Sequence, residues 1–102
     1  MRVKMCGMKT LAAARAAEEA GADYVGFIFA EGSRRYVAPE TAREIVRQLH
    51  RVQKVGVFVD APMDTVNEIA ELVGLDYVQL HGHETADMAR RAARPVIKAY
   101  RY

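Results

Sequence analysis

The sequence lacks several features that define common classes of protein. Its single cysteine cannot form an internal disulfide, which excludes a disulfide scaffold and fits a reducing, cytoplasmic location. No apolar run approaches the ~18 residues of a transmembrane helix, and we expect no signal peptide at the N-terminus. An excess of one charge is also missing: 15 basic and 13 acidic residues give a net charge of +2, without a basic block for nucleic acid.

What remains is typical of one α/β domain. The 102 residues are 51% hydrophobic and 27% charged, without a linker, so residues 1–102 form a single domain or part of a larger one. Short runs that are apolar on both faces predict parallel strands at residues 3–6, 24–29, 55–59, 77–80 and 96–100. Helical stretches between them predict helices at residues 10–20, 40–49, 64–73 and 85–93.

This alternation of strands and helices fits two architectures. One is an open, doubly wound sheet, which typically has a glycine-rich phosphate-binding turn after its first strand. The other is the first part of a (β/α)₈ barrel, in which the active-site groups follow the carboxyl ends of the strands. Residues 21–25 and 74–78 repeat a Gly-Ala/Leu-Asp-Tyr-Val approach to a strand, which indicates serial βα units. The spacing of the elements is compatible with both architectures.

Two candidate functional residues lie at or after the first two predicted strands. Cys6 ends the first strand near Lys4 and Lys9, whose positive potential favours the thiolate, a usable base or nucleophile. The alternative is that Cys6 is a small buried side chain. Arg35 lies in the loop after the second strand, and its guanidinium has the geometry to bind a carboxylate or phosphate. The alternative for Arg35 is a solvated loop with a surface ion pair.

Polar residues also lie at the end of the fourth predicted strand and directly after the third. Gln79 and His81 alternate with apolar residues, so both face one side of the fourth strand, where in a barrel a polar group needs a partner or a function. A histidine that is bonded to the scaffold is the simpler interpretation. Asp60 could reach a ligand from the end of the third strand, but we expect it to cap the next helix. No Cys/His/Asp cluster has the spacing of metal ligands, so we expect no metal site.

Five motifs then occur together along the chain: VKMCG at 3–7, GADYVGFIF at 21–29, SRRYV at 33–37, VGVFV at 55–59 and VQLHG at 78–82. In this combination, the chain resembles the phosphoribosylanthranilate isomerase family from end to end. The resemblance implies a (β/α)₈ barrel that acts in tryptophan biosynthesis. The implied reaction is the Amadori rearrangement of N-(5-phosphoribosyl)anthranilate to 1-(2-carboxyphenylamino)-1-deoxyribulose 5-phosphate, with no metal or organic cofactor.

The resemblance also implies a role for each candidate residue. Cys6 matches the family's general base, which takes the C2 proton of the sugar in the Schiff-base intermediate. Arg35 matches the arginine that clamps the anthranilate carboxylate, and Gln79 and His81 match positions that line the pocket. Lys9 departs from the family, which often has threonine at this position.

The family is longer than this chain, at roughly 200 residues. The resemblance implies that the general acid, an aspartate on the sixth strand, and the phosphate-binding loops of the seventh and eighth strands lie outside this sequence. We therefore expect a half-barrel whose C-terminal half is absent and which is inactive as an isomerase alone. It would be a fragment, a partner of its missing half, or a self-associated unit that pairs its open sheet edges. The alternatives are a non-catalytic assembly or folding unit and a flavodoxin-like binding module, which the composition of the first turn disfavours.

Overall fold

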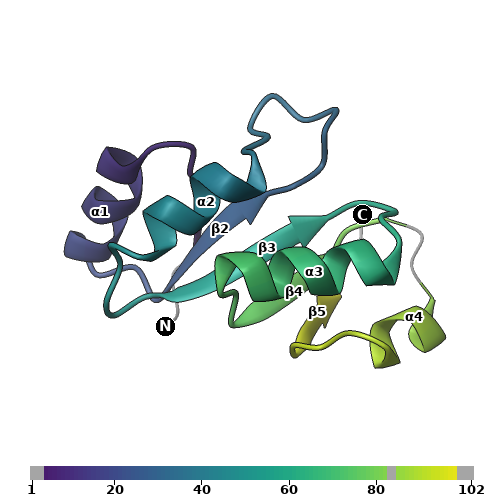
Figure 1. The fold of residues 1–102 in the computed structure, drawn as a ribbon. Helices are drawn as coiled ribbons and strands as arrows, with labels where there is room; N and C mark the ends of the chain where they lie inside the picture. Colours follow the sequence, from purple (N-terminus) through teal and green to yellow (C-terminus); the bar gives the residue numbers. More distant parts are fainter. Residues whose placement is uncertain (1–3, 83–84, 99–102) are drawn as a thin grey trace.

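Five parallel strands form one sheet in the computed structural model, which describes residues 4–82 and 85–98 (Figure 1). The strands lie side by side in chain order, and each neighbouring pair is parallel. The elements are β1 (Lys4–Cys6), α1 (Leu11–Glu19), β2 (Tyr24–Ile28), α2 (Pro39–Val46), β3 (Gln53–Phe58), α3 (Met63–Val73), β4 (Tyr77–Leu80), α4 (Ala86–Arg90) and β5 (Val96–Lys98). Within the described ranges no helix is long and apolar enough to cross a membrane.

The strand order decides between the two architectures. A doubly wound sheet reverses its strand order at a switch point and has helices on both faces. Right-handed connections between consecutive neighbours instead place the helices on one face, as in a (β/α)₈ barrel. Figure 1 shows α2 and α3 in front of the sheet, and these two helices pack against each other. The prediction of the first part of a (β/α)₈ barrel is confirmed.

The hydrophobic core lies between the helices and the sheet. Val25, Phe27 and Leu80 are fully buried on the helical side, where they form one cluster with helical residues that include Ala14, Ala42, Ile45, Val66 and Ala70. The residues that alternate with these strand positions point to the opposite face, which we call the inner face. Residues of the inner face include Lys4, Tyr24, Val57, Tyr77 and Gln79.

The element ends differ from the prediction by a few residues. β3 begins at Gln53 instead of residue 55, because Gln53 N–H donates to the Asp23 carbonyl at 2.9 Å and Lys54 N–H donates to Asp76 Oδ2 at 2.8 Å. These bonds, both donated by backbone N–H groups, extend the strand through polar residues. α2 ends at Val46 instead of residue 49, and α4 covers less than residues 85–93. The last two residues of the predicted fifth strand, 99–100, lie outside the described residues.

Candidate functional site

The loop after β2 places Arg35 against the loop after β1. A methyl group on the Gly7 Cα would clash with Arg35 Cδ and would lie 3.2 Å from its Nη1. Gly7 also has a φ of 84°, a left-handed conformation that side chains disfavour. A glycine at this position therefore lets the arginine reach the end of β1, directly beside Cys6. Cys6 itself is described through its backbone, which pairs with Gly26 of β2.

Hydrogen bonds hold the loop that carries Arg35. Ser33 Oγ accepts the Arg35 backbone N–H at 3.1 Å, and Tyr36 forms a parallel bridge with Ile28 at the end of β2. The Lys9 ammonium donates to the Arg34 carbonyl at 3.2 Å. Lys9 thus ties the loop after β1 to the loop after β2. The Arg35 residue remains exposed, so its guanidinium is accessible to a ligand.

Gln79 and His81 meet in a hollow of about 290 Å³ on the inner face, near the carboxyl ends of β2, β3 and β4. The Gln79 side chain accepts a hydrogen bond from the Lys4 ammonium through Oε1. The His81 backbone N–H donates to the Phe58 carbonyl at 2.9 Å, which fixes the residue at the end of β4. The full lining consists of Ile28, Ala30, Ser33, Val57, Val59, Gln79 and His81. Ser33 links this hollow to the loop that carries Arg35.

The expectation that Asp60 caps the next helix is wrong. The N-cap of α3 is Pro62, and no side-chain hydrogen bond caps this helix end. Asp60 has a φ of 52°, in the left-handed region. Its carboxylate lies against Gly82, where an added Cβ would be 2.7 Å from the Asp60 Cγ. Asp60 therefore joins the loop after β3 to the loop after β4 instead of stabilising α3.

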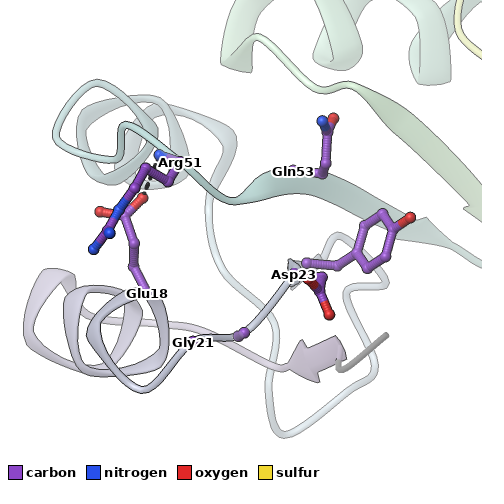
Figure 2. Close-up of a pocket in the computed structure, with 7 residues that line it drawn as sticks. Glu18, Gly21, Asp23, Arg51 and Gln53 are labelled. Atoms are coloured by element: carbon purple, nitrogen blue, oxygen red, sulfur yellow. Dashed lines mark hydrogen bonds between the residues drawn. The ribbon is translucent and has the colours of Figure 1, made fainter. Parts of the chain in front are cut away.

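A second hollow, of about 390 Å³, lies at the opposite, amino-terminal ends of β2 and β3 (Figure 2). Its lining includes Glu18 of α1 and Arg51 and Gln53 around the start of β3. None of its lining residues lies at the carboxyl end of a strand. We therefore place the candidate site at the carboxyl ends, where active sites of this architecture lie.

The sequence pattern does not indicate the role of Glu18. Its Oε2 accepts the backbone N–H groups of His50, Arg51 and Val52 at 2.8, 2.7 and 3.2 Å. The Arg51 N–H lowers the pKa of Glu18 most, and with the other two donors and the Arg51 charge it outweighs burial and brings the pKa to about 2. Glu18 thus holds the turn before β3. Nothing in its helix marks this contact, because the three donors lie 32 to 34 residues away.

The candidate site offers groups that bind anions and exchange protons. Arg35 supplies a guanidinium, Gln79 an amide and His81 an imidazole, around an end of β1 that carries a thiol. Over residues 4–82 and 85–98, no group of three His, Cys, Asp or Glu side chains is placed to hold a metal ion. The arrangement is suited to an organic acid and to proton transfer at a carbon atom.

Comparison with known proteins identifies relatives along the chain. Residues 3–102 match the family model described as N-(5'-phosphoribosyl)anthranilate (PRA) isomerase. A curated relative from Geobacter sp. strain M21, named N-(5'-phosphoribosyl)anthranilate isomerase, is 52% identical over 101 residues. The match covers 98% of this chain and 50% of that relative. The chain therefore spans about half the length of the curated relatives that it matches.

Solved structures of the same name share the fold. The phosphoribosyl anthranilate isomerase of Thermus thermophilus superposes with a TM-score of 0.95 and 46% identity, over 98% of this chain and 52% of that one. A second structure is described as a phosphoribosyl anthranilate isomerase in complex with reduced 1-(o-carboxyphenylamino)-1-deoxyribulose 5-phosphate. It has a TM-score of 0.94 and 44% identity, and the match covers 96% of this chain and 52% of that chain.

Proposed function

Because the chain belongs to the N-(5'-phosphoribosyl)anthranilate isomerase family, we propose that it supplies the half of the active site that removes the proton and binds the anthranilate. The proposed reaction is the Amadori rearrangement of N-(5-phosphoribosyl)anthranilate in tryptophan biosynthesis. The observation that carries the proposal is the position of Arg35 against Gly7, immediately after Cys6. This contact places an anion-binding group beside the end of the strand that carries the thiol.

Cys6 is the general base of this proposal. The substrate opens its sugar ring to a Schiff base, and the thiolate takes the proton from C2. The electrons of the C–H bond form a double bond between C1 and C2, and the electron pair of the C=N double bond moves onto the nitrogen of the protonated Schiff base. The resulting enol becomes the ketone of the product when its hydroxyl loses a proton and C1 gains one. A thiol titrates close enough to neutral pH to accept this proton when positive charge favours the thiolate.

Arg35 binds the carboxylate of the anthranilate ring. The exposed guanidinium has two parallel N–H groups that match the two oxygen atoms of a carboxylate. Gln79 and His81 line the neighbouring hollow and contact the sugar portion of the substrate. In this proposal, the carboxylate and the C2 proton are held on the same side of the substrate, where Cys6 and Arg35 meet.

The rest of the site comes from a partner. A general acid must protonate the ring oxygen, and a separate group must hold the phosphate. We assign both tasks to the C-terminal half of the barrel, so residues 1–102 form one half-barrel with negligible isomerase activity alone. We also propose a cytoplasmic location, where the reduced thiol is stable.

The sheet edges favour one alternative function. In the described sheet, β1 and β5 are the end strands, and each pairs with a neighbour on one side. Such edges pair readily with further strands. Two copies of the chain could therefore join edge to edge as a non-catalytic assembly unit, which light scattering would detect as a dimer.

The test is to restore the barrel. The chain is joined to the second half of the Geobacter relative, the half that its match does not cover, and we call this protein the restored barrel. We expect the restored barrel to convert N-(5-phosphoribosyl)anthranilate and the chain alone to show negligible turnover. An inactive but folded restored barrel, or equal turnover by the chain alone, would overturn the proposal.

A further inference from the structure

Lys4 reaches across the inner face of the sheet to Gln79. Lys4 lies on β1 and Gln79 on β4, so β2 and β3 separate their strands. The Lys4 ammonium nevertheless donates a hydrogen bond to Gln79 Oε1, and the two residues are 75 positions apart in the chain. A lysine side chain loses much rotamer freedom when it is held in this way. The contact therefore needs a function or a strong bond to compensate for that loss.

The chemistry of the two groups fixes the orientation of the amide. An ammonium has three donors and no acceptor, so its partner on Gln79 must be the carbonyl oxygen and cannot be the amide nitrogen. Gln79 also lines the hollow that contains His81 and Ser33. With its oxygen engaged by Lys4, the amide keeps its two N–H donors for a ligand in that hollow.

The geometry points to Lys4 as a positioning residue that holds the Gln79 amide as a hydrogen-bond donor to an oxygen atom of the substrate. This inference rests on the proposed function and adds a residue to it. Without Lys4, the amide can rotate and present its oxygen atom, which would repel an acceptor. A substrate that carries hydroxyl, carboxylate and phosphate oxygens offers many acceptors, so a fixed donor is the useful state of the amide.

A different role for Lys4 makes a different prediction. Its positive charge lies two residues before Cys6 in the chain, so it would favour the Cys6 thiolate if charge were its main effect. In that case, the loss of Lys4 would shift the pH dependence of kcat/KM and would not depend on Gln79. In the positioning role, the loss of Lys4 weakens substrate binding through Gln79 alone.

Kinetics of the restored barrel separate these roles. Lys4→Met keeps the length of the side chain but removes the donor, and we expect KM to rise about tenfold while kcat changes less than about twofold. Lys4→Arg retains a donor and restores most of the affinity. Gln79→Ala raises KM by a similar factor, and Lys4→Met in the Gln79→Ala background adds less than about twofold. Independent, multiplying effects of the two changes, or a shifted pH profile with unchanged KM, would overturn the inference.

A second readout does not require activity. In the chain labelled with ¹⁵N-glutamine, the side-chain amide signals of Gln79 are those that disappear in Gln79→Ala. We expect Lys4→Met to shift and sharpen these signals, as a released amide rotates freely, and Lys4→Arg to leave them near their original positions. Signals that do not respond to Lys4→Met would contradict the positioning role. If the restored barrel is inactive but the signals respond, the proposed function fails and the role of Lys4 in holding Gln79 stands.

Discussion

The two ends of the sheet use charged side chains in different ways. At the amino-terminal ends, one Glu18 oxygen accepts three backbone N–H groups, so the carboxylate is committed to the fold. At the carboxyl ends, the Arg35 side chain lies on a glycine and the residue stays exposed. The first arrangement stabilises a turn, whereas the second keeps a cation accessible beside Cys6. The difference is that the carboxylate at one end is bonded to the fold, whereas the guanidinium at the other end is left accessible, as our proposal of a ligand-binding Arg35 requires.

The largest expected effect comes from the end of β1. Cys6→Ala in the restored barrel removes the base, and we expect kcat to fall by about 10²- to 10⁴-fold, the usual contribution of a general base. The ligand named with the second solved structure, reduced 1-(o-carboxyphenylamino)-1-deoxyribulose 5-phosphate, is called the reduced product analogue below. Its binding, measured by calorimetry, should change little, because the thiol accepts a proton and does not clamp the ligand. An unchanged kcat would show that the role of Cys6 is wrongly assigned.

Removal of the Arg35 guanidinium should weaken ligand binding. Arg35→Ala is expected to weaken binding of the reduced product analogue by about 2–3 kcal/mol, roughly a 30- to 150-fold rise in Kd, because a charge-assisted pair of hydrogen bonds is lost. Arg34→Ala is the matched control, since this neighbouring arginine contributes its carbonyl, not its side chain, to the described contact with Lys9. Equal effects of the two substitutions would mean that the loop carries only general positive charge.

A smaller effect should follow from Gly7. Gly7→Ala places a methyl group where the Arg35 stem lies and strains a left-handed backbone, so we expect Kd for the analogue to rise about tenfold. Gly32→Ala, in the loop that carries Arg35, is the control, because a methyl group added there would meet no atom within 4 Å beyond its chain neighbours. If both variants bind the analogue as the parent does, the approach of Arg35 to Gly7 is not needed for binding.

The smallest effect is expected at the opposite end of the sheet. Glu18→Gln should lower the free energy of unfolding of the restored barrel by about 1 kcal/mol at pH 7, measured with urea, and leave kcat/KM unchanged. Glu19→Gln, on the next and exposed residue of α1, should change neither quantity.

The effect of Glu18→Gln on the free energy of unfolding should depend on pH. The folded state depresses the pKa of Glu18 from its usual 4.5 to about 2, so the carboxylate stabilises the fold fully above about pH 4.5. This contribution is lost as the pH falls from about 4.5 towards 2. The stability difference between the parent and Glu18→Gln should shrink over this range. A difference that stays constant from pH 7 to pH 3 would contradict the role of the ionised carboxylate.

Much of the fold could be predicted from local patterns. The apolar runs around Val25, Val57 and Val78 give the strands, and the glycines at 21 and 74 give the helix ends, because these signals come from residues close together in the chain. Gln79 and His81 are two residues apart at the carboxyl end of one strand, so it could also be predicted that both side chains face the same side of the sheet. These inferences need only strand direction and side-chain alternation.

The contacts that could not be predicted join distant residues. Glu18 and its three donors, and Lys4 and Gln79, become neighbours only when the sheet has formed. For Asp60, a local contact was predicted that does not form. A polar residue before a helix suggested a cap, but the Asp60 carboxylate packs on Gly82 of the next loop instead. Local spacing carries no information about which loop will lie beside which.

The most direct measurement uses the fact that the chain has one cysteine. The rate of Cys6 alkylation by iodoacetamide is followed by mass spectrometry of its peptide in the restored barrel, with and without the reduced product analogue. We expect the analogue to slow alkylation at least about tenfold in the parent and far less in Arg35→Ala at the same concentration. An alkylation rate that the analogue leaves unchanged, although it binds, would show that Cys6 and Arg35 do not serve one pocket.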